Sequence, residues 1–158
     1  MLETADFKKL VSLAPLFAID LVLLNDQQQI LLGKRTNSPA KDYWFVPGGR
    51  VFKNESLAQA FARISHSELG FTLELAQAQL IGLYDHFYQN SFVDEQLSTH
   101  YINATHLVKG IKLAINDLPK SQHQEYQWVG LNQLEGNSSV HNYSKIFLPN
   151  LNKLLAND

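Results

Sequence analysis

The chain has 158 residues, which suits one domain with a sizeable core, and 13 Lys and Arg against 15 Asp and Glu give a formal net charge of −2. This near-balance, with no block of like charge, argues against nucleic acid as a partner, and the longest apolar stretch is far too short to span a bilayer. Because there is no cysteine, disulfides, thiolate metal sites and a cysteine nucleophile are excluded. The N-terminal segment also lacks the apolar core of a secretory signal, so we expect a single cytoplasmic domain over residues 1–158.

The first part of the chain predicts one short helix and then extended segments. Thr4 can cap a short amphipathic helix that continues to about Leu13. The run LFAIDLVLL at 16–24 is apolar on both faces, which is typical of a buried strand. A second strand near 30–34 is expected to pair with it as a hairpin, and the short extended segment WFVPGG follows at 44–49.

The most clearly marked helix begins after these glycines. Ser56 with Gln59 three residues later forms a capping box, and Gly70 stands where a left-handed C-terminal cap is expected. Between them, apolar side chains recur at helical spacing at Leu57, Phe61 and Ile64. The pattern predicts an amphipathic helix that ends at the glycine.

The rest of the chain predicts more strands and a last helix. Three strands are expected near 79–88, 100–108 and 126–129, before a final amphipathic helix from about Tyr143 to Leu155. Strand pairs with a lone crossover helix do not make a doubly wound parallel sheet. The order therefore predicts an α/β fold of the α+β kind, with a mixed β-sheet sandwiched between α-helices.

Glu68 is the one anionic side chain of the predicted central helix. It lies four residues after Ile64, so its carboxylate continues the apolar stripe, and it sits in the last turn, where the helix dipole disfavours an anion. A positive group should therefore be nearby. The alternatives are a frayed helix end with Glu68 in solvent, or a structural ion pair with Arg63.

The segment GRVFKNESLAQAFARISHSELGF, at 49–71, resembles a Nudix box. The family pattern is a Gly, a Glu after five residues, an Arg after seven more, and a Glu-rich turn that ends on Gly and an apolar residue. The matching positions are Gly49, Glu55, Arg63, Glu68, Gly70 and Phe71. The resemblance implies the Nudix fold and a hydrolase.

Two positions depart from this pattern, since Ile64 replaces the Glu after the Arg and Ser67 replaces the first Glu of the terminal pair. In common Nudix hydrolases these carboxylates help to hold several divalent cations. The same departures mark one branch, the GDP-mannose mannosyl hydrolases, which the chain resembles over about residues 6–148. The matching stretches are LLGKRTN at 31–37, YWFVPGGRV at 43–51, HFY at 86–88, THY at 99–101, Gln122 and His123 with Tyr126 and Trp128, and VHNYSK at 140–145.

The resemblance implies hydrolysis of GDP-mannose, and also of GDP-glucose, to GDP and the free hexose, with one Mg²⁺ or Mn²⁺ per active site. The implied metal ligands are Glu68, the backbone carbonyl of Gly48 and the side-chain carbonyl of Gln122. Such oxygen ligands suit a hard divalent cation. By residue type alone, Gln122 would be an exposed loop residue.

Two arginines and a tyrosine are implied to contact the diphosphate. Arg35 and Arg50 stand at the ends of segments that lead into turns, and a guanidinium can hold phosphate oxygens bidentately. The resemblance places both beside the pyrophosphate and adds the Tyr101 hydroxyl as a donor to the leaving group. Surface charge is the alternative role for each arginine.

Three residues are candidates for binding the rest of the substrate. Asp20 interrupts an apolar strand, where a buried carboxylate needs a partner or a ligand unless it reaches solvent at a sheet edge. The resemblance implies that Asp20 and His86 orient the sugar. Phe7 is a candidate for stacking on the base, although core packing is the usual role of a phenylalanine.

His123 is implied to be the catalytic base. An imidazole changes its charge near neutral pH, so it can remove a proton from water. Next to the implied metal ligand Gln122, it would activate water for attack on the anomeric carbon, and the hexose would leave with inverted configuration. A solvent-exposed histidine is the alternative that its polar surroundings favour.

Two other functions stay open. One is a conventional Nudix diphosphatase, which cuts between phosphates and could draw carboxylates from Asp94 or Glu95. The other is a Nudix-like ligand-binding module without turnover. The expected partners are a nucleotide sugar and a second copy of the chain, since the resembling branch is dimeric, and neither nucleic acid nor a membrane is expected.

Overall fold

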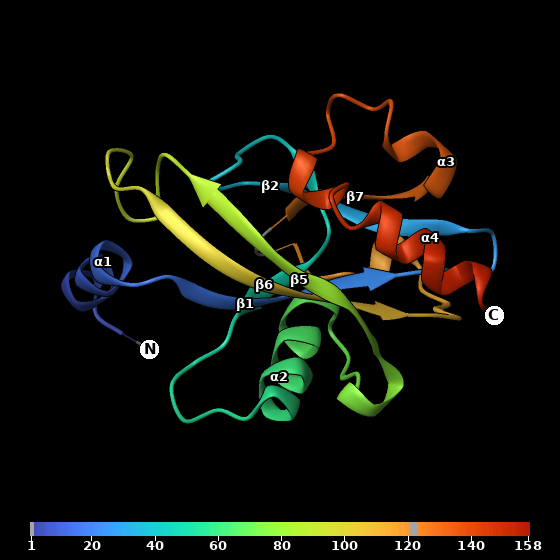
Figure 1. The fold of residues 1–158 in the computed structure, drawn as a ribbon, viewed down its shortest axis with the longest axis horizontal. Coiled ribbons are helices and arrows are strands. Elements are labelled where there is room, and N and C mark those ends of the chain that lie inside the picture. The colour runs from blue at the N-terminus through green and yellow to red at the C-terminus, as the bar shows by residue number, and fades with distance from the viewer. Residues whose placement is uncertain (1, 121–122) are drawn as a thin grey trace.

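The computed structural model describes residues 2–120 and 123–158. None of the helices in these ranges is long and apolar enough to cross a membrane. The elements, drawn in Figure 1, are α1 (Thr4–Leu13), β1 (Leu16–Leu23), β2 (Gln29–Arg35), β3 (Trp44–Phe45), β4 (Gly48–Arg50), α2 (Leu57–Leu69), η1 (Leu75–Gln77), β5 (Gln79–Tyr88), β6 (Thr99–Val108), η2 (Ile115–Asp117), β7 (His123–Gly130), α3 (Leu131–Leu134), η3 (Asn142–Ser144) and α4 (Leu148–Ala156).

Two sheets form the centre of the fold. One has the strand order β4-β1-β6-β5, and the other has the order β3-β2-β7. β1 runs parallel to β6 and antiparallel to β4, whereas both pairs in the second sheet are antiparallel. The strands lie between α2 on one side and α4 on the other (Figure 1). The predicted mixed sheet between helices is therefore confirmed.

β1 is central because both of its faces are apolar. Ile19 packs in a core that includes Phe61 of α2, whereas Val22 packs in a second core that includes Leu151 of α4. All four side chains are fully buried. The expectation of a strand buried on both faces is confirmed, and Asp20 is a polar exception within it.

Helix α2 forms as its capping signals predict. The Ser56 side chain accepts a hydrogen bond from the backbone N–H of Gln59, and the Gln59 side chain accepts one from the backbone N–H of Ser56. The helix ends at Gly70, whose φ of 80° lies in the left-handed region that glycine tolerates. These two caps fix the length of α2 and thereby place Glu68 in its last turn.

The predicted hairpin between the first two strands is wrong. β1 uses one edge for β4 and the other for β6, so β2 pairs with β3 and β7 instead. A bridge between Leu24 and Ile30 joins the two strands at the turn. The turn itself forms because the Asn25 side chain accepts hydrogen bonds from the backbone N–H groups of Gln27 and Gln29. Non-local pairing thus decides the sheet to which β2 belongs.

Two helix boundaries also differ from the prediction. Glu3, and not Thr4, is the N-cap of α1, and its side chain makes no capping hydrogen bond. The final helix begins at Leu148 rather than near Tyr143, because Pro149 lacks an N–H and fits only the first turn of a helix. The residues before it form the separate turn η3.

Candidate active site

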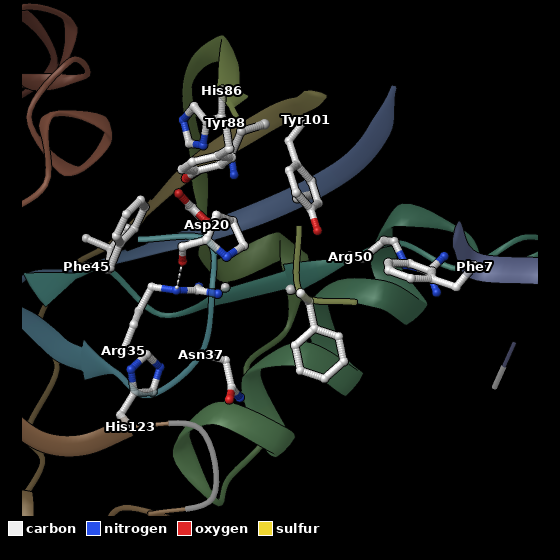
Figure 2. A pocket seen from close by; sticks show the side chains of 17 residues that line it. Phe7, Asp20, Arg35, Asn37, Phe45, Arg50, His86, Tyr88, Tyr101 and His123 are labelled. Carbon is white, nitrogen blue, oxygen red and sulfur yellow. Dashed lines mark hydrogen bonds between the residues drawn. The ribbon is translucent and has the colours of Figure 1, made fainter. Parts of the chain in front are cut away.

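A pocket of about 390 Å³ is lined by residues from both sheets (Figure 2). Residues two apart on a strand point to the same face of a sheet, and four strands of the first sheet each contribute such a pair. The pairs are Ala18 and Asp20, Gly48 and Arg50, His86 and Tyr88, and Tyr101 and Asn103. The second sheet contributes Arg35, Phe45 and His123, of which Arg35 and His123 are opposite one another in the β2–β7 register.

This pocket brings together most of the residues that the sequence nominated. Its lining includes Phe7, Asp20, Arg35, Gly48, Arg50, His86, Tyr101 and His123. Glu68 is connected to the pocket through His123, and Gln122 lies outside the described residues. Residues that are far apart in the sequence therefore converge on one cavity.

Glu68 and His123 form a buried pair at this pocket. The His123 Nε2 atom lies 3.0 Å from Glu68 Oε2, and the two side chains are only 4% and 3% exposed. The imidazole is thus the partner that a carboxylate buried in the last helical turn requires. The alternatives of a solvated Glu68 and of an exposed His123 are wrong.

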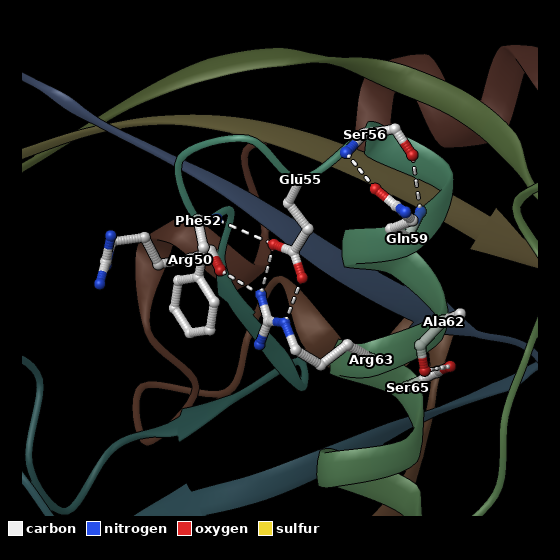
Figure 3. A network of polar contacts seen from close by, with 8 residues as sticks. All are labelled: Arg50, Phe52, Glu55, Ser56, Gln59, Ala62, Arg63 and Ser65. Carbon is white, nitrogen blue, oxygen red and sulfur yellow. Dashed lines mark hydrogen bonds and ion pairs between the residues drawn. The ribbon is translucent and has the colours of Figure 1, made fainter. Parts of the chain in front are cut away.

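The alternative ion pair between Glu68 and Arg63 is also wrong, because Arg63 is bound elsewhere (Figure 3). Its guanidinium donates to both carboxylate oxygens of Glu55, and its Nη2 also donates to the backbone carbonyl of Arg50 at 2.7 Å. These hydrogen bonds hold the pKa of Glu55 below its usual range. The brace fixes the loop between β4 and α2, and with it the end of the strand that carries Arg50.

Asp20 is a buried carboxyl group with an elevated pKa. Burial raises the pKa of Asp20 to about 7, although a hydrogen bond from Asn103 and the charge of Arg35 oppose this rise. The Thr105 hydroxyl donates to Asn103 Oδ1 at 2.9 Å, which leaves the Asn103 amide N–H to donate to Asp20. Near neutral pH this carboxyl group can therefore be a donor or an acceptor.

His86, on the edge strand β5 of the same sheet, is held neutral by its surroundings. Burial, together with the nearby His141, lowers the pKa of His86 to about 4. Its ring is stacked on Tyr143, with the centroids 4.3 Å apart and the planes 4° from parallel. The Tyr143 hydroxyl is fixed in turn by the backbone of Phe87. The ring is therefore rigidly placed.

Three buried side-chain atoms of the described residues have no hydrogen-bond partner, and all three belong to residues that line this pocket. They are Asp20 Oδ2, His86 Nε2 and His123 Nδ1. Buried polar atoms are normally paired in folded proteins, so the free atoms of Asp20 and His86 indicate a site that a polar ligand completes, whereas His123 Nδ1 is packed against the backbone at Gly33.

Two arginines give the pocket its positive charge, and a neutral tyrosine lies between them. Arg35 Nε donates to the carbonyl of Pro39 at 3.0 Å, which fixes its side chain beside the cavity. Burial raises the pKa of Tyr101, while the charges of Arg35 and Arg50 oppose this rise. Tyr101 thus keeps its proton and can act as a donor between two positive charges.

Tyr88 and Asn103 line the pocket but were not nominated from the sequence. Burial raises the pKa of Tyr88 well above its usual range, and the neighbouring Asp20 adds to the rise. The signal that could have found them is strand alternation, because Tyr88 is two residues after His86 and Asn103 is two residues after Tyr101.

The fold and this geometry agree with what is found in known proteins. A family model described as NUDIX domain matches residues 15–151, which is most of the chain. The chain belongs to the Nudix family.

Individual relatives differ in what their names state. The low-salt glycan biosynthesis protein Agl8 of Haloferax volcanii is 40% identical over 97 residues, 61% of this chain and 60% of that protein. A Bacillus subtilis protein, named provisionally as an 8-oxo-dGTP diphosphatase, is 40% identical over 75 residues, 48% of this chain and 45% of that protein. The matched parts thus span about half to three fifths of these curated relatives. The MutT protein of Methanosarcina mazei shares the fold, with a TM-score of 0.71 at 20% identity over 89% of this chain and 96% of that one.

The two departures from the Nudix box have distinct places in the structure. Both residues lie on α2, where Ile64 is buried in the core and Ser67 is exposed. Asp94 and Glu95, the other carboxylates considered for this site, do not line the pocket. In the described part of the chain, no group of three or more His, Asp or Glu side chains is arranged to hold a metal ion.

The Nudix family implies a divalent cation, and the donors in this chain fit one ion better than a cluster. Glu68 is a buried carboxylate, and Mg²⁺ needs only one or two protein oxygens when phosphate and water complete its shell. A Cβ on Gly48 would collide with the Asp20 carboxylate and the Ile19 carbonyl, so this stretch of backbone packs closely against β1. Glu68 fits a single hard cation, and Gly48 lines the pocket to which Glu68 is connected through His123.

The buried imidazole of His86 predicts a specific pH dependence of stability. Unfolded His86 takes up a proton below about pH 6.5, whereas the folded chain resists protonation down to about pH 4, so native stability falls as the pH drops through this window. His86→Phe keeps a ring against Tyr143 and removes the titration. The loss in unfolding free energy between pH 7 and pH 5 should be about 2 kcal/mol smaller in the variant, as measured by urea denaturation. Equal losses in both proteins would show that the ring titrates normally in the native state.

Gly33 is predicted to be required for the position of His123. A Cβ at residue 33 would lie 2.5 Å from His123 Nδ1 and 2.6 Å from Cγ, so the ring would have to leave Glu68. Gly33→Ala should lower the unfolding free energy by about 1 to 3 kcal/mol, although alanine normally suits a strand better than glycine. Gly136→Ala is the matched control, since nothing lies within 4 Å of a Cβ there, and it should change stability by less than about 0.5 kcal/mol. Equal stability of the two variants would contradict the tight packing at Gly33.

Proposed function

We propose that this protein hydrolyses GDP-mannose, and also GDP-glucose, to GDP and the free hexose, by attack of water at the anomeric carbon with inversion. The observation that carries this proposal is the buried contact of His123 with Glu68, which belongs to a Nudix box that lacks two of its glutamates. One carboxylate suits a single cation, and an imidazole supplies a base without a carboxylate cluster. The Haloferax relative, named for glycan biosynthesis, supports a substrate that carries a sugar.

His123 is the proposed general base, with Nε2 as the atom that takes the proton from water. This nitrogen is hydrogen-bonded to Glu68 in the structure, so it would act as a base only when the Glu68 carboxylate turns to a bound cation and releases it. Its other nitrogen, Nδ1, lies against the backbone at Gly33, where there is no room even for a methyl group. The hydrogen bond to Glu68 keeps Nε2 on the side of the proposed metal ligand. A base held in one orientation is a more effective catalyst than a mobile one, because the entropy of ordering its side chain is lost during folding and not during the reaction.

The leaving group is a diphosphate, which departs without a proton if its charge is neutralised. Glu68, the Gly48 carbonyl and Gln122, which lies outside the described residues, would hold one Mg²⁺ or Mn²⁺, and such an ion neutralises a diphosphate when bound. Arg35 and Arg50 add two positive charges at the same pocket, and Tyr101 adds a hydroxyl donor. A general acid is therefore not required.

The sugar is assigned to the part of the pocket around Asp20 and His86. Both are buried, both have an unpartnered polar atom, and His86 is uncharged at neutral pH. Hexose hydroxyls are neutral donors and acceptors, so they can pair these atoms without a buried charge. Tyr88 and Asn103 add a hydroxyl and an amide on the same sheet face.

The diphosphatase remains the second candidate, favoured by the name of the Bacillus relative. It needs water activated against phosphorus, for which common members use the carboxylates that positions 64 and 67 lack here. A binding module without turnover would need His123 only as the partner of the buried Glu68 and not as a base.

The resemblance to the dimeric branch also supports a cytoplasmic homodimer, which sedimentation of the purified protein tests.

The bond that breaks separates the proposed function from both alternatives. Hydrolysis of GDP-mannose in oxygen-18 water should place the label in mannose and none in GDP, because water attacks carbon. Proton NMR should show the β anomer of mannose as the first product of the α-linked substrate. Label in a phosphate, or GMP and mannose 1-phosphate as products, would assign the diphosphatase, and no turnover of any nucleotide sugar would assign the binding module.

The roles of the buried pair can be separated by two isosteric variants. His123→Gln should lower kcat for GDP-mannose by about 10²- to 10⁴-fold while Mn²⁺ binding persists, because an amide can bond Glu68 but is not a base. Glu68→Gln should instead weaken Mn²⁺ binding, because it removes the anionic ligand. Initial rates and Mn²⁺ titration measure the two effects. Normal turnover by His123→Gln would remove this residue as the base, and two or three Mn²⁺ per unsubstituted chain would contradict the single-cation site.

A further inference from the structure

Three segments of the chain are tied together beside the pocket by polar contacts. The loop between β5 and β6 is joined to α1 by an ion pair of Asp94 with Lys8, with 3.1 Å between the charged atoms. The same loop is joined to the segment after β2, where the Ser38 hydroxyl donates to Glu95 at 2.6 Å. Asn90 also donates to Glu95 at 2.9 Å, within the loop. We call these contacts the clasp.

Each segment of the clasp also carries a residue that lines the pocket. Phe7 precedes Lys8 in α1, Asn37 precedes Ser38, and Phe92 lies two residues before Asp94. The polar ties therefore hold three pocket-lining side chains from distant parts of the sequence in one place.

Phe92 is the least explained of the three. Its side chain lines the pocket although the residue is 64% exposed, and within the described residues its ring makes no aromatic or cation–π contact. The turn that carries it is well fixed, because the buried Ser91 exchanges hydrogen bonds with the backbone of Asp94. An exposed aromatic ring on a fixed turn beside a cavity is a surface on which a flat ligand can stack.

Phe7, which the sequence analysis nominated for stacking on the base, is less available to a ligand than Phe92. The Arg50 guanidinium lies over its ring, 5.2 Å from the centroid. The ring thus already has a cation on one face. Asn37 has no hydrogen-bond partner among the described residues, and its amide offers both a donor and an acceptor (Figure 2).

We propose that the segments held together by the clasp form a nucleobase subsite, in which the base stacks on Phe92 and its polar edge meets the Asn37 amide. This assignment rests on the proposed nucleotide-sugar substrate and adds the residues that bind its base. It is consistent with the rest of the pocket, where the arginines suit the diphosphate and the sugar is assigned to Asp20 and His86. The stacking surface lies on a loop, which is where binding residues commonly occur on a rigid scaffold.

Calorimetric titration with GDP and with inorganic pyrophosphate, in the presence of Mg²⁺, tests this subsite. Phe92→Ala should weaken GDP binding by about 5- to 100-fold, as expected for the loss of one base–aromatic stack, and should leave pyrophosphate binding unchanged. Phe92→Tyr should restore GDP binding, because any aromatic ring can stack. Asn37→Ala should also weaken GDP binding without affecting pyrophosphate.

Phe87→Ala is the matched control. Phe87 is 61% exposed, lies in the same hairpin and does not line the pocket, and its ring stacks on His100 with centroids 4.4 Å apart. This variant should bind both ligands like the unsubstituted chain. Unchanged GDP binding in Phe92→Ala, or an equal loss for GDP and pyrophosphate, would overturn the subsite.

The outcomes also separate this inference from the proposed function. If the chain binds GDP through Phe92 but does not hydrolyse GDP-mannose, the proposed reaction fails and the subsite stands. If the chain hydrolyses GDP-mannose with carbon–oxygen cleavage and Phe92→Ala has the same GDP affinity and KM, the reaction stands and the subsite fails.

Discussion

The hydrogen bond between Glu68 and His123 joins the two halves of the fold at the pocket. Glu68 lies in the last turn of a helix that packs against the first sheet, and His123 begins a strand of the second sheet. Several local features have to agree for the two groups to meet. The caps of α2 set the helix length, and Gly33 leaves space for the imidazole. Because each member would be a buried polar group without the other, the contact constrains the fold as well as the chemistry.

The pocket combines fixed positive charge with groups on which burial disfavours charge. Arg35 and Arg50 supply the positive charge, and both act on Tyr101. Burial disfavours charge on Asp20 and on His86, since it raises the pKa of the acid and lowers that of the base, and Arg35 is close enough to Asp20 to oppose the first of these shifts. A ligand that carries an anionic group and a neutral polar group matches this combination. A nucleotide sugar has both, whereas a ligand with a second anionic group would place charge where the protein disfavours it.

Local signals in the sequence predict those parts of the structure that depend on neighbouring residues. The box of Ser56 and Gln59 and the glycine at 70 give both ends of α2, and the strand at 79–88 has the predicted bounds. The partner of β2 could not be predicted in the same way, because both edges of β1 are taken by strands distant in sequence. A turn signal in the sequence predicts that the chain reverses its direction. It does not identify the strand edge with which the next strand will pair.

The residues of the candidate site show the same difference between what local sequence signals predict and what only the structure reveals. Asp20, Glu68 and His123 could be nominated because each conflicts with its surroundings or matches a motif. Tyr88 lies in the matching stretch HFY but was given no role there, and Phe92 does neither, since a tyrosine in a strand and a phenylalanine near one are ordinary residues. Their positions become informative only when the alternation of β5 and the clasp are known. Sequence thus finds the residues that are chemically out of place, and the structure adds those that are ordinary in type but specifically placed.

The two departures from the Nudix box differ in their physical consequences. Ile64 is buried, and its Cγ1 would lie only 3.1 Å from a Cβ on Gly49, so it fills the space between α2 and β4. A glutamate there would need a cation or another partner to be buried without cost. Ser67 is exposed, so its side chain alters charge with little effect on packing. The core is therefore arranged for an apolar residue at 64, and the Glu55–Arg63 brace and both helix caps persist around it. What the box retains is the structure that positions Glu68, and what it lacks is the negative charge that several cations would need.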